Sequence, residues 1–167
     1  MLNEKLYSPA ELARACEKLG ANGKRLVFTN GCFDLLHVGH VRYLQAARKL
    51  GDALVIALNG DASVRALKGD SRPINSEQDR AEVLSALECV DFVTIFPDMR
   101  VTNLVREVRP HIYAKGGDYT VESLDADERA ALVEAGAELK ILPLVPGKST
   151  TGIIEKMGSG KQESRKE

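Results

Sequence analysis

Two of the three histidines in this sequence lie within one short segment, GCFDLLHVGH, which spans residues 31–40. His37 and His40 are separated by Val38 and Gly39. If a helix begins near His37, both imidazoles lie on its first turn, where free backbone N–H groups and the helix dipole favour an anion. Gly39 has no side chain, so a ligand can approach the backbone closely. The segment therefore predicts a polyphosphate-binding site, whose imidazoles could stabilise charge that develops as a phosphoryl or nucleotidyl group transfers.

Two other interpretations of the histidine pair are open. The two side chains could simply be polar groups at a solvated helix start. Alternatively, Cys32, His37 and His40 could bind zinc, which accepts cysteine and histidine ligands. Asp34 or His111 would then have to supply the fourth ligand, and neither stands at a characteristic spacing. We therefore expect no resident metal ion at this segment.

A second segment with phosphate-binding chemistry is PGKSTTG, at residues 146–152. It imitates the end of a P-loop, but such a loop needs glycine where this chain has Leu142, and it follows the first strand of a fold. The segment is therefore not a P-loop. Its backbone amides and hydroxyl side chains still precede a predicted helix, so they indicate either a second phosphate site or an ordinary helix cap. The hydroxyls belong to Ser149, Thr150 and Thr151.

Two further segments supply charged side chains. The segment LKGDSRPIN, at residues 67–75, contains Lys68 and Arg72. Lys68 suits a flexible point charge that reaches a triphosphate, whereas Arg72 or Arg80 suits a bidentate phosphate clamp. The segment KGGDY, at residues 115–119, ends a predicted strand with paired glycines and a carboxylate. Each segment alone is typical of an ordinary surface, but their positions after successive predicted strands favour a shared site.

Hydrophobic patterning predicts the elements that position these segments. Continuous apolar runs predict strands, and capped amphipathic runs predict helices. The expected strands are residues 26–29, 54–58, 92–96, 112–114 and 139–142, and the expected helices are residues 9–19, 37–50, 76–89, 101–108, 126–135 and a short one from about residue 149. This alternation predicts an α/β fold, with a mostly parallel five-stranded sheet and helices on both faces. Residues 59–75 are expected to form a long polar loop of functional importance.

Composition sets the limits of the molecule. The chain has 167 residues, 44% of them hydrophobic and 28% charged, so we expect one globular domain, at residues 1–157. Residues 158–167 have no apolar side chain and predict a disordered tail. The net charge of −1 gives no bulk attraction to nucleic acid or to an anionic membrane, and we expect neither partner. Without a membrane-spanning run or a signal peptide, we expect a cytoplasmic protein with free thiols.

Five blocks of the sequence, taken together, resemble the cytidylyltransferase-like nucleotidyltransferases: TNGCFDLLHVGHVRYL, LKGDSRPIN, RAEVL, KGGDY and GKSTTGII. The resemblance covers residues 6–157 and is greatest to the D-glycero-β-D-manno-heptose 1-phosphate adenylyltransferases. It implies a Rossmann-like, doubly wound fold and a direct displacement. In that reaction a sugar phosphate oxygen attacks the α-phosphorus of ATP, and pyrophosphate leaves with the assistance of Mg²⁺. The product would be ADP-heptose, for lipopolysaccharide core synthesis.

The resemblance also implies roles for individual residues. Transition-state stabilisation and phosphate contacts would fall to His37, His40 and Lys68. The nucleotide would be held by Asn30, Gly31, Cys32, Phe33, Gly39, Gly117, Asp118, Ser149, Thr150 and Thr151. The acceptor would contact Asp34, Asn59, Arg72 and Arg80. Gly60 and His111 depart from the family pattern, which has a small polar residue and an aspartate at these positions.

Alternatives and partners complete the expectations. The nearest alternative is a cytidylyltransferase that acts on glycerol 3-phosphate or a similar phosphorylated alcohol, because the phosphate-binding residues would be shared. A nucleotide-binding sensor without turnover is a further alternative. The resemblance favours a homodimer. Since no kinase segment precedes the motif, it also favours a stand-alone enzyme that receives heptose 1-phosphate from a separate heptose-phosphate kinase.

Overall fold

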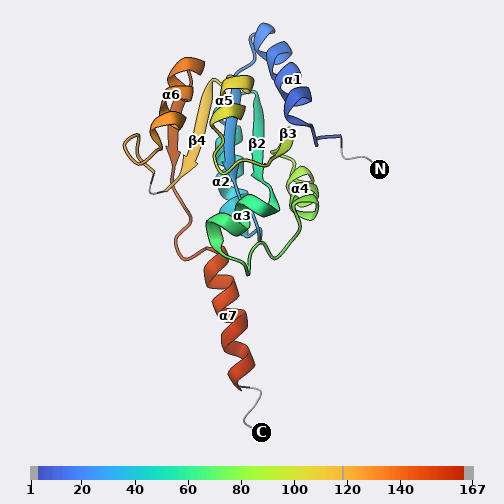
Figure 1. Ribbon diagram of the computed structural model, residues 1–167, viewed down its shortest axis with the longest axis vertical. Coiled ribbons are helices and arrows are strands. Elements are labelled where there is room, and N and C mark those ends of the chain that lie inside the picture. The colour runs from blue at the N-terminus through green and yellow to red at the C-terminus, as the bar shows by residue number, and fades with distance from the viewer. Residues whose placement is uncertain (1–3, 118, 164–167) are drawn as a thin grey trace.

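The sheet has the predicted α/β architecture. The computed structural model describes residues 4–117 and 119–163, and within them lie one parallel sheet and the helices around it (Figure 1). The strands are β1 (Leu26–Gly31), β2 (Ala53–Asn59), β3 (Phe92–Phe96), β4 (Ile112–Gly116) and β5 (Glu138–Leu142). The helices are α1 (Pro9–Ala21), α2 (Val38–Arg48), α3 (Asp61–Lys68), α4 (Glu77–Ser85), α5 (Thr102–Val108), α6 (Ala126–Ala135) and α7 (Thr150–Glu163).

The strand order creates a crevice at the middle of the sheet. The order is β3-β2-β1-β4-β5, and all neighbouring strands are parallel. The chain therefore leaves β1 in one direction to build β2 and β3, and then crosses back to build β4 and β5 on the other side. Connections diverge at the carboxyl ends of β1 and β4, which is where doubly wound sheets bind ligands. The predicted Rossmann-like, doubly wound fold is confirmed.

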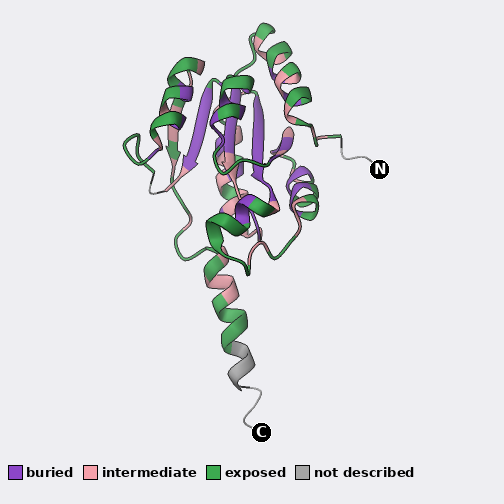
Figure 2. Ribbon diagram, in the orientation of Figure 1, coloured by how far each residue is buried: buried purple, intermediate pink, exposed green. Residues whose placement is uncertain are grey.

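Two hydrophobic cores cover the two faces of this sheet. One core packs α1, α5 and α6 against the sheet through residues such as Leu12, Val105 and Leu132. The other core packs α2 and α4 through Leu44 and Leu84. Every residue of β2 is buried, as its continuous apolar run predicts for a strand with both faces covered (Figure 2). Each fully buried leucine contributes roughly 2 kcal/mol to stability, so the two cores hold the helices on the sheet.

The segment at residues 59–75 differs from the expected loop, because it contains helix α3. The N-cap of α3 is Gly60, which has no side chain with which to cap the helix. The carboxylate of Glu77 takes that role and accepts a hydrogen bond of 2.7 Å from the Asp61 N–H. A Cβ at Gly60 would lie 3.0 Å from Glu77 Oε2, so glycine leaves room for this distant cap. Glu77 is 16 residues from Asp61 in the chain, so local sequence patterns do not predict this cap.

The carboxyl-terminal helix reaches beyond the predicted domain boundary at residue 157. Helix α7 projects away from the body of the protein and continues to Glu163, into the stretch for which composition predicts disorder (Figure 1). Within it, Ser159 Oγ donates to the backbone oxygen of Glu155 over 2.8 Å. A helix satisfies its backbone hydrogen bonds internally, so a polar composition does not by itself end one. Residues 164–167 of the predicted tail lie outside the described residues.

Two smaller observations complete the fold. The side chain of Val83 is on the solvent side of α4 and is 51% exposed, whereas the adjacent Leu84 is fully buried. No helix in the described part of the chain combines the length and apolar character needed to cross a membrane.

Candidate active site

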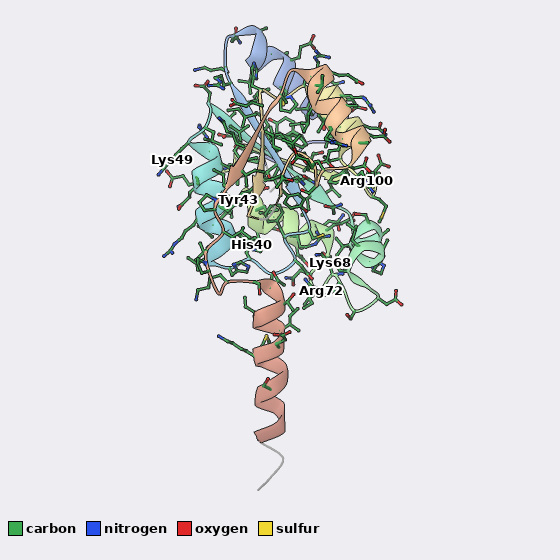
Figure 3. All side chains as sticks on the ribbon, turned by 90° about the vertical axis from the view of Figure 1, so that its left-hand side faces the viewer. His40, Tyr43, Lys49, Lys68, Arg72 and Arg100 are labelled. Carbon is green, nitrogen blue, oxygen red and sulfur yellow. The ribbon has the colours of Figure 1, made fainter. Side chains whose placement is uncertain are left out.

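A cavity of about 770 Å³ opens at the carboxyl edge of the sheet, at the strand-order switch point. Its walls come from the ends of β1, β2 and β4, the start of α2, the end of α3 and the segment that leads into α7. Figure 3 shows His40, Tyr43, Lys68 and Arg72 gathered between the sheet and the beginning of α7. The volume is typical of a small-molecule site.

The structure brings most of the residues predicted for the site to this one cavity. Those that line it are Asn30, Gly31, Cys32, Phe33, Asp34, His37, Gly39, His40, Asn59, Lys68, Arg72, Ser149, Thr150 and Thr151. Gly117 and Arg80 do not line it. Asp118 lies outside the described residues.

His37 caps α2 and stacks on His40. The Nδ1 atom of His37 accepts a hydrogen bond of 3.1 Å from the Gly39 N–H. The two imidazole rings are stacked, with their centroids 3.9 Å apart. Burial, together with the charge of Lys148, lowers the pKa of His37. A neutral His37 whose Nδ1 accepts must carry its proton on Nε2, which leaves that N–H available as a donor to a ligand.

His40 is the more deeply buried of the two histidines. Burial is the main cause that lowers its pKa to about 4, and the neighbouring His37 adds to the effect. Its Nδ1 atom is buried without a hydrogen-bond partner among the described residues. His40 is therefore neutral at pH 7, and a buried polar atom without a partner at the wall of a cavity is typical of a functional group.

Gly39 is required for the close packing of this corner. A Cβ at this position would lie 2.8 Å from His37 Cε1 and 3.2 Å from Lys148 Cβ. We therefore expect Gly39→Ala to push the His37 ring out of its stack and to lower the rate of any reaction at the site roughly tenfold, the scale of a small misplacement. Steady-state kinetics measure this loss. Gly158→Ala, on α7 where an added Cβ meets nothing within 4 Å, is the matched control.

The amino-terminal end of α7 meets the amino-terminal end of α2. Thr150 Oγ1 donates a hydrogen bond of 3.1 Å to the backbone oxygen of Leu35, in the loop that precedes α2. Ser149 Oγ accepts a hydrogen bond of 3.0 Å from the Gly152 N–H. The two predicted phosphate sites are therefore parts of one corner, at which two helix dipoles present their positive ends.

Asp34 holds the loop that carries Arg72. Its carboxylate accepts three hydrogen bonds, which measure 2.5 Å from Arg72 Nε, 2.8 Å from the Ile74 N–H and 3.1 Å from the Asn75 N–H. Burial acts to raise the pKa of Asp34, but the hydrogen bonds from Asn75, Arg72 and Ile74 outweigh it and hold the pKa below its usual range. Arg72 uses only Nε on Asp34, so its two terminal amino groups remain for a phosphate.

Arg80, which was predicted to contact the acceptor, lies behind the cavity wall rather than in it. It is 2% exposed, and its guanidinium donates to the Cys32 oxygen at 2.6 Å, to Asp61 Oδ1 at 2.8 Å and to the Asn75 oxygen at 3.1 Å. Cys32 precedes Phe33, whose φ of 43° is costly for a residue with a side chain. Three of its five N–H bonds are directed to these groups, so Arg80 holds the loop that carries Cys32 and Phe33 from behind the cavity wall.

Sequence reasoning missed one wall of the cavity. It is formed by Lys115 and Tyr119, the two residues at the ends of the KGGDY segment, which had no predicted role, and by Glu128 of α6. Tyr43 of α2, which shares a hydrogen bond of 2.8 Å with Thr29, also lines the cavity. The strand-end position of Lys115 was a usable signal, but nothing local marks Glu128, which the α6 packing brings there.

The zinc interpretation does not fit the geometry. His111 Nδ1 accepts from the Leu26 N–H over 3.2 Å, at the amino-terminal end of β1 and thus at the opposite edge of the sheet. Asp34, the other proposed ligand, is occupied by Arg72 and two backbone N–H groups. Within residues 4–117 and 119–163 there is no group of three or more His, Cys, Asp or Glu side chains that could hold a metal ion.

A doubly wound sheet with two helix amino termini at its switch point defines a nucleotide-binding α/β protein. The Cytidylyltransferase-like family profile matches residues 28–156, and the chain belongs to this family. The resemblance seen in the sequence is thereby confirmed.

Individual relatives agree with this assignment. The chain is 53% identical over 156 residues to the Bifunctional protein HldE of Pelobacter propionicus, covering 93% of this chain and 31% of that protein. It is 55% identical over 136 residues to the Bifunctional protein HldE of Syntrophotalea carbinolica, covering 81% of this chain and 27% of that protein. The chain thus spans about 30% of the length of these curated relatives.

A solved structure has the same fold. It is the crystal structure of the lipopolysaccharide core biosynthesis protein from Thermoplasma volcanium, with a TM-score of 0.59 and 31% sequence identity. The match covers 74% of this chain and 98% of that one.

Proposed function

We propose that this chain is an adenylyltransferase that moves AMP from ATP to D-glycero-β-D-manno-heptose 1-phosphate, giving ADP-heptose and pyrophosphate. The observation that carries the proposal is the stacked pair of neutral histidines at the corner where α2 and α7 meet. The identity of about one half to the bifunctional HldE proteins, and the likeness to a lipopolysaccharide core biosynthesis protein, support a role in making the lipopolysaccharide core.

The reaction needs no covalent enzyme intermediate. A phosphate oxygen of the acceptor attacks the α-phosphorus of ATP, and the bond from that phosphorus to the β-phosphate oxygen breaks. This nucleophile is already ionised at neutral pH, so no general base is required. Negative charge grows on the oxygens of the transferring and leaving phosphates. Neutral His37 and His40 act as preorganised N–H donors to these oxygens, which is the kind of stabilisation that usually contributes most to catalysis.

Other groups at the cavity would hold the phosphates. Lys68, at the end of α3, is a flexible cation at the mouth of the cavity. Arg72 offers a planar pair of donors fixed by Asp34. The amino-terminal amides of α7 and the hydroxyl of Thr151 complete the phosphate corner, which the hydrogen bond from Thr150 to Leu35 holds against the start of α2.

Mg²⁺ fits this site as an ion that is bound to the phosphates of the nucleotide. The cavity presents cations and N–H donors rather than free carboxylates at its phosphate corner, and Asp34 is saturated by its own hydrogen bonds. Mg²⁺ characteristically binds substrate phosphates with few protein ligands. When bound, it would offset the charge of the departing pyrophosphate.

The second candidate is cytidylyl transfer to glycerol 3-phosphate or a related alcohol, which the name of the matched family favours. Pyrophosphate release with Mg²⁺ separates the two, with ATP and CTP crossed against heptose 1-phosphate and glycerol 3-phosphate. We expect release with ATP and the heptose phosphate alone. Release with CTP would move the chain to the second candidate, and no release in any of the four reactions would favour the nucleotide-binding sensor.

Several partners and properties belong to the proposal. We propose a single functional domain at residues 1–157, a cytoplasmic location and a homodimer. A heptose-phosphate kinase must supply the acceptor. In the proposed site, Asp34, Asn59 and Arg72 lie on the acceptor side, and residues 30–33 and 149–151 lie on the nucleotide side.

A further inference from the structure

The wall of the cavity formed by Lys115, Glu128 and Asn30, with Tyr113 buried behind them, differs in chemistry from the phosphate corner. Lys115 and Glu128 are each only 8% exposed, and their charged atoms, Nζ and Oε1, are 3.8 Å apart. Lys115 Nζ donates a hydrogen bond of 2.8 Å to Asn30 Oδ1. The same atom lies over the rings of Tyr113 and Tyr119, at 5.1 and 4.8 Å from their centroids. The hydroxyl of Tyr113 lies within hydrogen-bond distance of two acceptors, Asn30 Oδ1 and Glu128 Oε1, and its single proton can be donated to only one of them. We call these four residues the diol wall, for the reason given below.

The groups of the diol wall have hydrogen-bonding capacity that the protein does not use. Of the three N–H bonds of Lys115, one is directed to Asn30, and Glu128 is too distant for a hydrogen bond. Glu128 Oε2 receives no hydrogen bond from the described part of the chain, and Asn30 Nδ2 donates none to it. Among the described residues, neither Glu128 nor Asn30 has a fully buried polar atom without a partner, so the unused atoms are accessible, and both residues line the cavity with Lys115. A ligand in the cavity can therefore supply partners to these atoms in place of solvent.

The arrangement selects the chemistry of that ligand. Donors from Lys115 and Asn30 lie beside an acceptor from Glu128, so the ligand must both accept and donate hydrogen bonds at adjacent positions. A phosphate fails this requirement, because it cannot donate to Glu128 and its charge is repelled by that carboxylate. Two neighbouring hydroxyl groups satisfy it, since each oxygen can accept from an N–H while its own O–H donates to the carboxylate.

We propose that the diol wall binds a vicinal diol of a substrate sugar. In the bound state Glu128 Oε2 accepts from one hydroxyl, while Lys115 Nζ and Asn30 Nδ2 donate to the two oxygens. Lys115 fixes Asn30 by donating to its carbonyl oxygen, which leaves the amide nitrogen for the ligand. This assignment rests on the proposed function, in which two molecules carry such a diol: the ribose of the nucleotide and the ring of the acceptor sugar. The same chemistry serves for both, and experiment separates them.

Two variants, Glu128→Gln and Lys115→Met, test the wall. Each is expected to raise the KM for one of the two substrates by about tenfold to a hundredfold, the value of a hydrogen bond to a charged group, while kcat changes less. Glu134→Gln is the matched control on the same helix, because Glu134 pairs with the exposed Arg106 and does not line the cavity. KM for ATP and for the heptose phosphate is measured by pyrophosphate release, and the melting temperature is recorded for every variant.

A double variant, Lys115→Met with Glu128→Gln, distinguishes binding from a structural role. Each single variant leaves one buried charge without its partner, so its melting temperature should fall, and the double variant should recover part of that fall. If the wall binds a diol, KM stays raised in the double variant. Recovery of KM together with the melting temperature, or single variants that lower only the melting temperature, would overturn the proposal.

Analogues identify the source of the diol. If the ribose binds there, 2′-deoxy-ATP and 3′-deoxy-ATP bind the wild type more weakly, and Glu128→Gln removes that difference. If the acceptor binds there, only the KM for the heptose phosphate rises. An equal loss for ATP and both deoxy analogues, with an unchanged acceptor, would indicate a contact with the base and contradict the proposal. Calorimetric titration of ATP and heptose phosphate, each alone, into wild type and Glu128→Gln gives the same comparison even if no turnover is found.

Discussion

His40→Ala is expected to lower kcat by about two to three orders of magnitude while the protein keeps its fold, the usual cost of losing one preorganised transition-state donor. The half-buried imidazole packs edge-to-face with Phe33, with ring centroids 5.4 Å apart, and stacks on His37. Alanine removes the ring without introducing a charge or a clash. Single-turnover and steady-state rates of pyrophosphate release measure the loss, and circular dichroism checks the fold.

His111→Ala is the matched control for this substitution. The His111 imidazole receives the Leu26 N–H at the far edge of the sheet, so its loss should lower the melting temperature without changing kcat. The family pattern has an aspartate where this chain has His111. An aspartate would also accept the Leu26 N–H, so either residue can serve at this position. A wild-type kcat in His40→Ala would remove His40 from the reaction.

The pH dependence follows from the lowered pKa of His40, which burial and His37 hold at about 4 in the folded protein against 6.5 ordinarily. The unfolded chain therefore binds more protons on this residue at acidic pH. The stability that comes from neutral His40 is complete above pH 6.5 and is lost progressively as the pH falls from 6.5 to 4. Melting temperatures of His40→Ala should fall less steeply across that range than those of the wild type. The activity that depends on neutral His40 should likewise be flat above pH 6.5.

The sequence predicts the part of this site that is local. His37, Gly39 and His40 are within one helical turn, so their grouping follows from spacing alone, and the five apolar runs predict the sheet that places them at a strand end. The carboxyl-edge rule then brings residues such as Lys68 and Thr150 to the same place. These predictions rest on short-range periodicity in the sequence and on connection rules that leave few possible topologies for such a sheet.

What the sequence could not predict depends on side chains that meet only after folding. Glu77 caps α3 across 16 residues, which makes a helix of a segment that locally reads as a loop. The Arg80 guanidinium turns inward because Cys32, Asn75 and Asp61 offer it oxygen atoms beneath the wall, whereas an arginine in a polar segment is usually at the surface. Glu128 reaches the cavity because α6 packs beside β4, and no motif marks it.

Asp34→Asn is expected to destabilise the protein by about 2 kcal/mol, the scale of hydrogen bonds to a charged group, and to lower kcat/KM for the acceptor at least tenfold. The carboxylate is the common acceptor for Arg72 and for the N–H groups of Ile74 and Asn75, so its loss releases the loop that carries Arg72. An amide of the same shape can accept only some of these bonds and gives Arg72 no counter-charge. Chemical denaturation and acceptor kinetics measure the two effects.

Asp91→Asn is the control that separates the general effect of losing an arginine-paired carboxylate from the particular effect of losing the Asp34 carboxylate. Asp91 also pairs with an arginine, Arg48 at 2.8 Å, and accepts the Leu54 N–H, but it lies outside the cavity. Its variant should lose some stability and keep its kcat/KM. Since the pKa of Asp34 is held below 3.8, its contribution is present above that pH and disappears as the pH falls further, and Asp34→Asn should lack this acid-dependent loss. Equal kcat/KM in Asp34→Asn and Asp91→Asn would show that Arg72 takes no part in acceptor binding, because the two variants differ in whether the loop at the cavity is released.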